Sequence, residues 1–144
     1  ICVFRRGDAI FVMEGYDSLK DEVFYRPLGG EIEFGEKARD TVIRELREEI
    51  SAEVTNLRFL EAVENLFTLE GEPGHEIVLI FEGDFVDSSF YEREALEGKE
   101  EDEVPFVASW KPLDVFRRGE HPLYPDELLD LLDGREDSRP DAPH

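Results

Sequence analysis

Three glutamates in the segment RELREE have a spacing that places them on one face of a helix. Glu45, Glu48 and Glu49 stand three and four residues apart, so at about 100° per residue their side chains project together. Like charges at this spacing repel each other, and the repulsion grows where water is excluded. Arg44 can neutralise part of this charge. Because the set contains carboxylates and no His or Cys, a magnesium or manganese ion is the expected further partner.

The plain alternative is that RELREE is a solvated helix face in a very acidic protein. The chain has 37 Asp and Glu against 16 Lys and Arg, a formal charge of -21. Such a surface repels nucleic-acid backbones and anionic membranes, so neither duplex nucleic acid nor a membrane is an expected partner. Most charge runs are solvated surface, and taken alone the fragment favours that interpretation. The residues that flank RELREE must therefore decide between a solvated helix face and a metal site.

The wider spacing resembles the Nudix box, the signature of hydrolases that cleave nucleoside diphosphates linked to another group. Six positions match with the correct gaps: Gly30, Glu36, Arg44, Glu45, Glu48 and Glu49. The resemblance runs from Gly30 to Ala52, and it departs from the pattern at Ser51, where the box has a glycine. That glycine ends the helix, so Ser51 is expected to change the helix end and not the ligands. The implied fold is α/β, a Nudix-type α/β/α sandwich with a mixed, partly antiparallel sheet between helices.

The resemblance also implies a role for each box residue in a metal-dependent pyrophosphohydrolase. Water would attack a phosphorus of a nucleoside diphosphate linked to another moiety, with Mg²⁺ or Mn²⁺ as cofactor. Glu48 and Glu49 would bind the metal, and Glu45 would bind a second ion or take the proton from water. Arg44 would orient Glu45, Glu36 would support the network, and the Gly29 carbonyl would complete the metal shell. The alternative is a non-catalytic nucleotide-binding or sensor module, although such relatives usually lose box carboxylates.

The pair Gly29-Gly30 admits two explanations. Glycine tolerates a positive φ, which would make this a plain turn, and it also lets the backbone approach a neighbouring group closely. The second explanation would bring the backbone near the metal.

Several residues outside the box are weaker candidates. A further carboxylate is expected from Glu100 to Glu103, with Glu103 favoured. Arg26 and Arg5 are candidates for binding a substrate phosphate, and an internal ion pair is the alternative for both. His75 either faces the substrate or leaves a hairpin. The aromatic residues Tyr25, Phe67, Tyr124 and Trp110 are first of all expected in the core.

Apolar periodicity predicts the elements that must carry these residues. ICVF and AIFVME predict a hairpin, and residues 23–25 a short strand. Apolar residues every four positions from about Glu36 predict a long helix. Strands are predicted at 54–68, in HEIVLIFEGDF and at 104–110, with a helical turn at 92–97 and a helix at 125–132. Residues 1–134 are expected to form one domain, followed by a disordered acidic tail at 135–144.

A single cysteine, Cys2, and the absence of a long apolar run indicate a cytoplasmic protein. The chain starts at Ile1 without an initiator Met, which is compatible with residues preceding it. The resemblance leaves the small-molecule nucleotide substrate open among nucleotide sugars, oxidised triphosphates, dinucleoside polyphosphates and reduced dinucleotides. It is also compatible with a homodimer.

Overall fold

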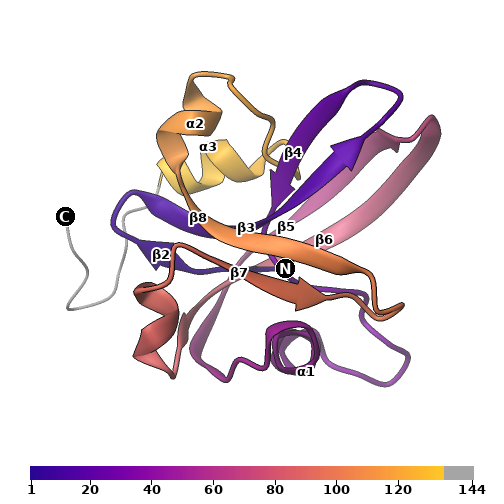
Figure 1. Cartoon of the computed structure of the whole chain (residues 1–144). Helices are drawn as coiled ribbons and strands as arrows, with labels where there is room; N and C mark the ends of the chain where they lie inside the picture. Colours follow the sequence, from indigo (N-terminus) through magenta and orange to yellow (C-terminus); the bar gives the residue numbers. More distant parts are fainter. Residues whose placement is uncertain (135–144) are drawn as a thin grey trace.

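Two β-sheets lie between helices in the computed structural model, which describes residues 1–134 (Figure 1). The first sheet has the order β1-β6-β5, and the second has the order β2-β3-β8-β7 with β4 also paired to β3. Only the β1–β6 pair is parallel among the described strands. The strands are β1 (Cys2–Val3), β2 (Arg5–Arg6), β3 (Ala9–Asp17), β4 (Glu22–Arg26), β5 (Val54–Leu69), β6 (Glu72–Phe85), β7 (Ala95–Lys99) and β8 (Pro105–Pro112).

The helices are unevenly shared between the two outer faces. Helix α1 lies on one side of the sheets, and α2 and α3 lie together on the other (Figure 1). Their bounds are α1 (Ala38–Ile50), α2 (Leu113–Arg117) and α3 (Leu128–Asp133), and a short 3-10 helix η1 covers Ser88–Tyr91. The α/β class and the mixed, partly antiparallel pairing are thus confirmed. Among residues 1–134, no helix has both the length and the hydropathy that a bilayer crossing requires.

The strands form two sheets and not the expected single one, and the first segment of the chain contributes to both sheets because it changes partners at Phe4. Cys2 pairs in parallel with Phe81, whereas Arg5 pairs antiparallel with Ile10. Phe4 is fully buried at this change, and its ring stacks on Phe85 with centroids 3.9 Å apart. The segment ICVFRR therefore joins both sheets through one buried aromatic pair.

Strand β3 separates two hydrophobic cores because its side chains alternate between the faces of the sheet. Phe11 and Met13 pack in the core on the α1 side, with Val42 and Leu46 of the helix. On the other side, Ile10 and Val12 pack with the apolar residues of α2 and α3. Trp110 is buried in the α1-side core, as expected from the sequence.

Two hairpin turns distant in sequence are tied together by Asp17 at the end of β3. Its buried carboxylate accepts backbone N–H groups of Leu19 and Lys20 in its own turn and of Glu70 in the β5–β6 turn. The Glu70 carboxylate in turn accepts the backbone N–H of Ser18 at 2.7 Å and also its hydroxyl. The tips of the β3–β4 and β5–β6 hairpins thus form one junction.

Several predicted elements need correction. The predicted helical turn at 92–97 is wrong, because β7 begins at Ala95 and pairs with β8, so hairpin pairing overrides local preference. Helix α2 was not predicted, and α3 begins at Leu128, later than the predicted start at Pro125. Strand β5 is one long strand. The tail predicted at 135–144 lies outside the described residues.

Helix α1 ends at Ser51, which adopts the left-handed conformation with φ 56° and ψ 34°. The backbone N–H groups of Ser51 and Ala52 donate to the carbonyls of Arg47 and Leu46, so the last turn is satisfied. The position keeps the backbone that glycine favours, but Ser51 has a Cβ that this conformation penalises.

Substituting glycine here should remove that penalty. We expect Ser51→Gly to raise the free energy of unfolding by about 0.5–1 kcal/mol, measured by urea denaturation. Ser51→Ala is the matched control, because it keeps the Cβ and should give no such gain. Equal effects of the two substitutions would show that the left-handed backbone is not the source of the strain.

Candidate active site

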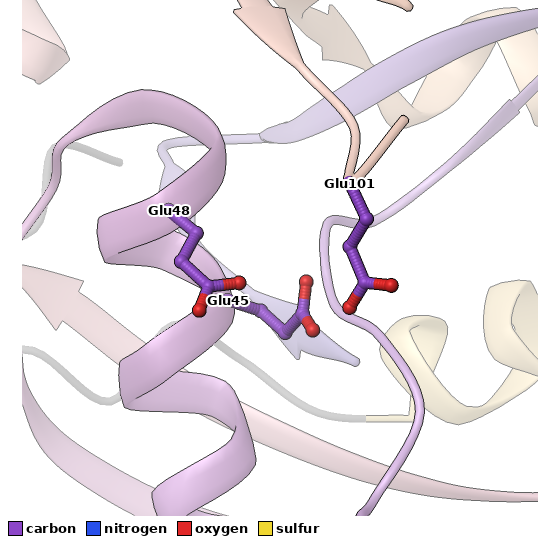
Figure 2. Close-up of side chains that lie close together, drawn as sticks. All are labelled: Glu45, Glu48 and Glu101. Carbon is purple, nitrogen blue, oxygen red and sulfur yellow. The ribbon is translucent and has the colours of Figure 1, made fainter. Parts of the chain in front are cut away.

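Three carboxylates from two separate segments converge at one end of α1. Glu45 and Glu48 come from successive turns of the helix, and Glu101 comes from the loop that joins β7 to β8 (Figure 2). One oxygen from each lies within 4.8 Å of the others. Glu45 is buried, whereas Glu48 and Glu101 are exposed. The group therefore offers three oxygen donors at a single point reachable from solvent.

Glu49 lies beside this group and is also buried. Burial raises the pKa of Glu49 to about 8, and a hydrogen bond with Glu45 and the negative charge of Glu45 add to the effect. The charge of Glu45 likewise raises the pKa of Glu101. In the absence of a cation, a proton on Glu49 thus relieves the repulsion between two neighbouring buried carboxylates.

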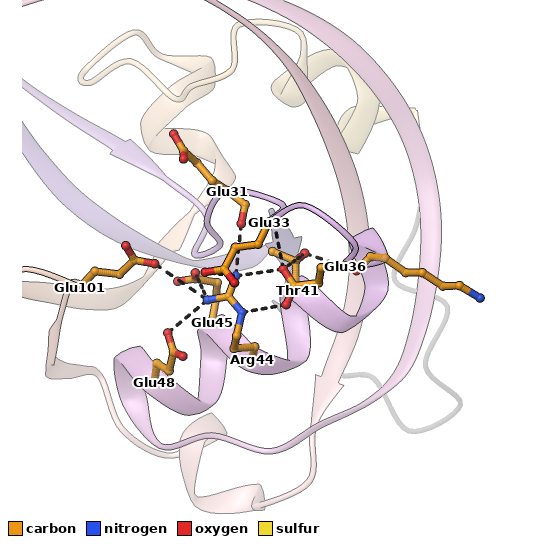
Figure 3. Close-up of polar contacts among 9 residues, drawn as sticks. Glu31, Glu33, Glu36, Thr41, Arg44, Glu45, Glu48 and Glu101 are labelled. Carbon is orange, nitrogen blue, oxygen red and sulfur yellow. Dashed lines mark hydrogen bonds and ion pairs between the residues drawn. The ribbon is translucent and has the colours of Figure 1, made fainter.

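The Arg44 guanidinium lies among the carboxylates of the cluster and contacts several of them (Figure 3). Its Nε and Nη2 donate to the two carboxylate oxygens of Glu36 at 2.8 and 3.0 Å. Its Nη1 donates to Glu45 at 2.6 Å and to Glu48 at 3.2 Å. The hydrogen bonds from Arg44 and from the Thr41 hydroxyl lower the pKa of Glu36 to about 2. Glu36 therefore stays ionised and holds the guanidinium in a fixed orientation.

The charges around Arg44 do not balance. Five carboxylates lie within 4.0 Å of its guanidinium nitrogens, so one positive charge faces five acidic side chains. These side chains are Glu33, Glu36, Glu45, Glu48 and Glu101. These carboxylates raise the pKa of Arg44, which remains charged. The excess of carboxylate oxygen donors, without His or Cys among them, suits magnesium or manganese.

Gly30 leaves room for the close approach of the Glu45 carboxyl group. A Cβ at position 30 would lie 2.3 Å from the Glu45 carboxyl carbon, and one at position 29 would lie 2.7 Å from the Ile1 Cα. Neither glycine has a positive φ. Close approach, and not turn geometry, therefore explains the Gly29-Gly30 pair, although what approaches Gly30 is a side chain.

The cluster borders a cavity of about 760 Å³ that has two chemically different walls. One wall is acidic and includes Glu45, Glu49 and Glu101. Strand β6 lines the cavity mainly with apolar residues, namely Ile77, Val78, Leu79 and Phe81, together with Glu76. Gly29 and Arg26 also line the cavity. A cation held by the carboxylates could attract an anionic group to the acidic part of this cavity, and an uncharged moiety could pack against the apolar residues.

The structure brings together some of the sequence-based candidates and separates others. Glu36, Arg44, Glu45, Glu48 and Glu49 form one connected group, with Gly29 and Arg26 on the adjoining cavity.

Arg5 is not brought to this group. Its side chain is buried, and it donates to the backbone carbonyl of Leu132 at 3.1 Å, so it holds α3 against the sheet. His75 pairs with Glu64 across the β5–β6 hairpin at 3.2 Å, in agreement with the hairpin interpretation.

Glu103 also lies apart from the three converging carboxylates. The residue has a positive φ of 64°, and its side chain forms an ion pair with Lys99 at 3.6 Å. Glu101 is the member of the acidic loop that reaches the cluster. The register of the β7–β8 hairpin, with Lys99 opposite Pro105, positions the loop so that Glu101 is the acid that reaches Glu45 and Glu48. Sequence spacing gave no signal for it, nor for Thr41, which supports Glu36 at 2.6 Å.

Comparisons with known proteins agree with this geometry. The family model of the NUDIX domain matches residues 1–132. A NUDIX hydrolase from Nitrosomonas europaea is similar in structure, with a TM-score of 0.63 at 15% identity over 92% of this chain and 82% of that one. The ORF135 protein of E. coli has a TM-score of 0.58 at 18% identity over 97% and 90% of the two chains. The mutator MutT protein from Bacillus halodurans has a TM-score of 0.58 at 19% identity over 96% of this chain and 81% of that one. With the family match across nearly the whole described chain, the protein belongs to the Nudix hydrolase family.

Proposed function

We propose that this protein is a metal-dependent pyrophosphohydrolase that cleaves a phosphoanhydride bond in a nucleoside diphosphate linked to another moiety. The observation that carries the proposal is the convergence of the Glu45, Glu48 and Glu101 oxygens within 4.8 Å at the edge of a cavity. A solvated helix face would not need two buried carboxylates or an arginine shared among five acids.

The donor set fits a divalent cation. Glu48, Glu49, Glu45 and Glu101 would hold Mg²⁺ or Mn²⁺, with the Gly29 carbonyl as a further candidate oxygen. Such an ion neutralises charge on a pyrophosphate and lowers the pKa of water bound to it. Loss of the proton from Glu49 would accompany binding, because a carboxylate ligates in its ionised form.

The protein's own groups would then divide the remaining work. Arg44 engages Oε1 of Glu45 at 2.6 Å and leaves Oε2 free of that contact, to accept a proton from water or to bind a second ion. Glu36 keeps Arg44 in place through two hydrogen bonds. The apolar wall of Ile77 and Leu79 would support the part of the substrate that is not phosphate.

Replacing two of the carboxylates tests this proposal directly. We expect Glu48→Gln with Glu49→Gln to abolish hydrolysis in a magnesium assay against a panel of nucleotides, while circular dichroism shows an intact fold. Glu61→Gln with Glu97→Gln removes the same charge from exposed strand positions and should retain activity. Full turnover in the first pair would defeat the assignment, and nucleotide binding without any product from the native protein would favour the sensor module.

The close approach at Gly30 gives a second test. In Gly30→Ala the new Cβ would meet the Glu45 carboxyl group at 2.3 Å, so that carboxylate must shift from the position in which Arg44 binds it. We expect kcat to fall by about tenfold or more, since small displacements of catalytic groups are costly. Gly134→Ala, at a position with a negative φ where a Cβ would come no nearer than 3.6 Å to another atom, is the control and should leave kcat unchanged.

The raised pKa of Glu49 predicts a pH dependence of stability in metal-free protein. Between the ordinary value of 4.5 and the folded value of about 8, the folded state keeps a proton that the unfolded state releases. The free energy of unfolding should therefore decrease as pH rises through this window. Glu49→Gln should flatten that part of the Tm profile, and Mg²⁺ should restore Tm at pH 8 in the native protein alone. The same slope in both proteins would contradict the assignment.

A further inference from the structure

Arg26 is the one Lys or Arg side chain among the described residues that line the cavity. It lies at the end of β4, opposite Met13 of β3, and its side chain is 43% exposed. Seven carboxylates line the same cavity, which leaves Arg26 as the one protein side chain there with a permanent positive charge. An anionic substrate that enters the cavity is therefore expected to seek this guanidinium.

Arg26 is already engaged by a carboxylate of the protein. Its Nη2 lies 3.6 Å from Oε1 of Glu100, in the loop between β7 and β8. The loop is closed by two backbone hydrogen bonds, from Glu100 to Val104 and from Glu103 to Glu100. The next residue, Glu101, lies 3.9 Å from Arg44. Consecutive acids of one loop thus contact the two arginines on either side of the site.

The ion pair between Arg26 and Glu100 is weak enough for a substrate phosphate to replace it. At 3.6 Å it is longer than a charge-assisted hydrogen bond, and both side chains are about two-fifths exposed. Exposed ion pairs of this kind contribute little to stability. A phosphate group can accept two parallel N–H bonds from a guanidinium through two of its oxygens, so it would displace the Glu100 carboxylate.

We propose that Glu100 competes with a substrate phosphate for Arg26, and so determines how tightly this site holds its phosphoanhydride. The inference rests on the proposed function. In the free protein the Glu100 carboxylate neutralises Arg26. On binding, a phosphate of the substrate takes over the guanidinium, and Glu100 turns to solvent. Glu100 thus weakens phosphate binding at the one arginine among the described residues that line the cavity.

Binding of α,β-methylene-ADP with Mg²⁺, measured by calorimetry, tests the competition without turnover. Removing the charge in Glu100→Gln should lower Kd by about two- to fivefold, the size expected for the loss of one exposed ion pair. Arg26→Ala should raise Kd. Adding Glu100→Gln to Arg26→Ala should then give no comparable decrease in Kd, because the guanidinium for which Glu100 and the phosphate compete is absent. Glu97→Gln, on the same hairpin but not on the cavity, is the matched control and should not change Kd.

The outcomes separate this inference from the proposed function. An unchanged or raised Kd in Glu100→Gln, or an equal gain in the Arg26→Ala background, overturns the competition even if the native protein hydrolyses nucleotides. A gain that depends on Arg26 supports the competition even if no nucleotide is hydrolysed. Failure of both the native protein and Glu100→Gln to bind the analogue counts against the competition as well as the proposed site.

Discussion

The surplus of negative charge around Arg44 is the constraint on which the site depends. Glu45 and Glu49 are buried side by side, and one guanidinium lies among five carboxylates. Two features of the chain reduce the repulsion. The fork of Arg44 binds Glu36 through two nitrogens, and the raised pKa of Glu49 keeps a proton between neighbouring acids. The remaining imbalance is what makes the cluster receptive to a cation, since an isolated buried carboxylate is otherwise costly.

The scaffold makes this concentration of charge tolerable because its other contacts are apolar and closely packed. Val42 and Leu46 attach α1 to the core on the face adjoining the acids. At the other side of the helix, Gly30 leaves the space that the Glu45 carboxyl group occupies. Ser51 ends the helix in a conformation that its side chain disfavours, yet the following backbone keeps its hydrogen bonds. The apolar packing of one face of α1 thus offsets the charge repulsion among the carboxylates on another face.

The sequence predicted the helix and its acidic face because both follow from local periodicity. Residues 38–50 repeat apolar side chains every four positions, and the same period groups Glu45 with Glu48 and Glu49. Contacts across the fold were less accessible. Arg5 looks like a surface cation in the sequence, and only the packing of α3 shows that it is buried. Similarly, four adjacent acids are equivalent in the sequence until the β7–β8 turn brings Glu101 to Glu45 and Glu48 and leaves Glu103 paired with Lys99. Tertiary pairing also turned a predicted helical segment into β7.

The junction at Asp17 has a consequence for the apolar wall of the cavity. Ile77 lies on β6, which begins two residues after Glu70, so an outward movement of this hairpin tip would have to break the Glu70–Asp17 hydrogen bond. A bulkier ligand against this wall would then have to shift the β3–β4 and β5–β6 hairpins together, so we expect this side of the cavity to be stiff. Adaptation to ligands of another size would then proceed by exchanging side chains along the strand, whereas lengthening either turn would loosen a surface that both hairpins share.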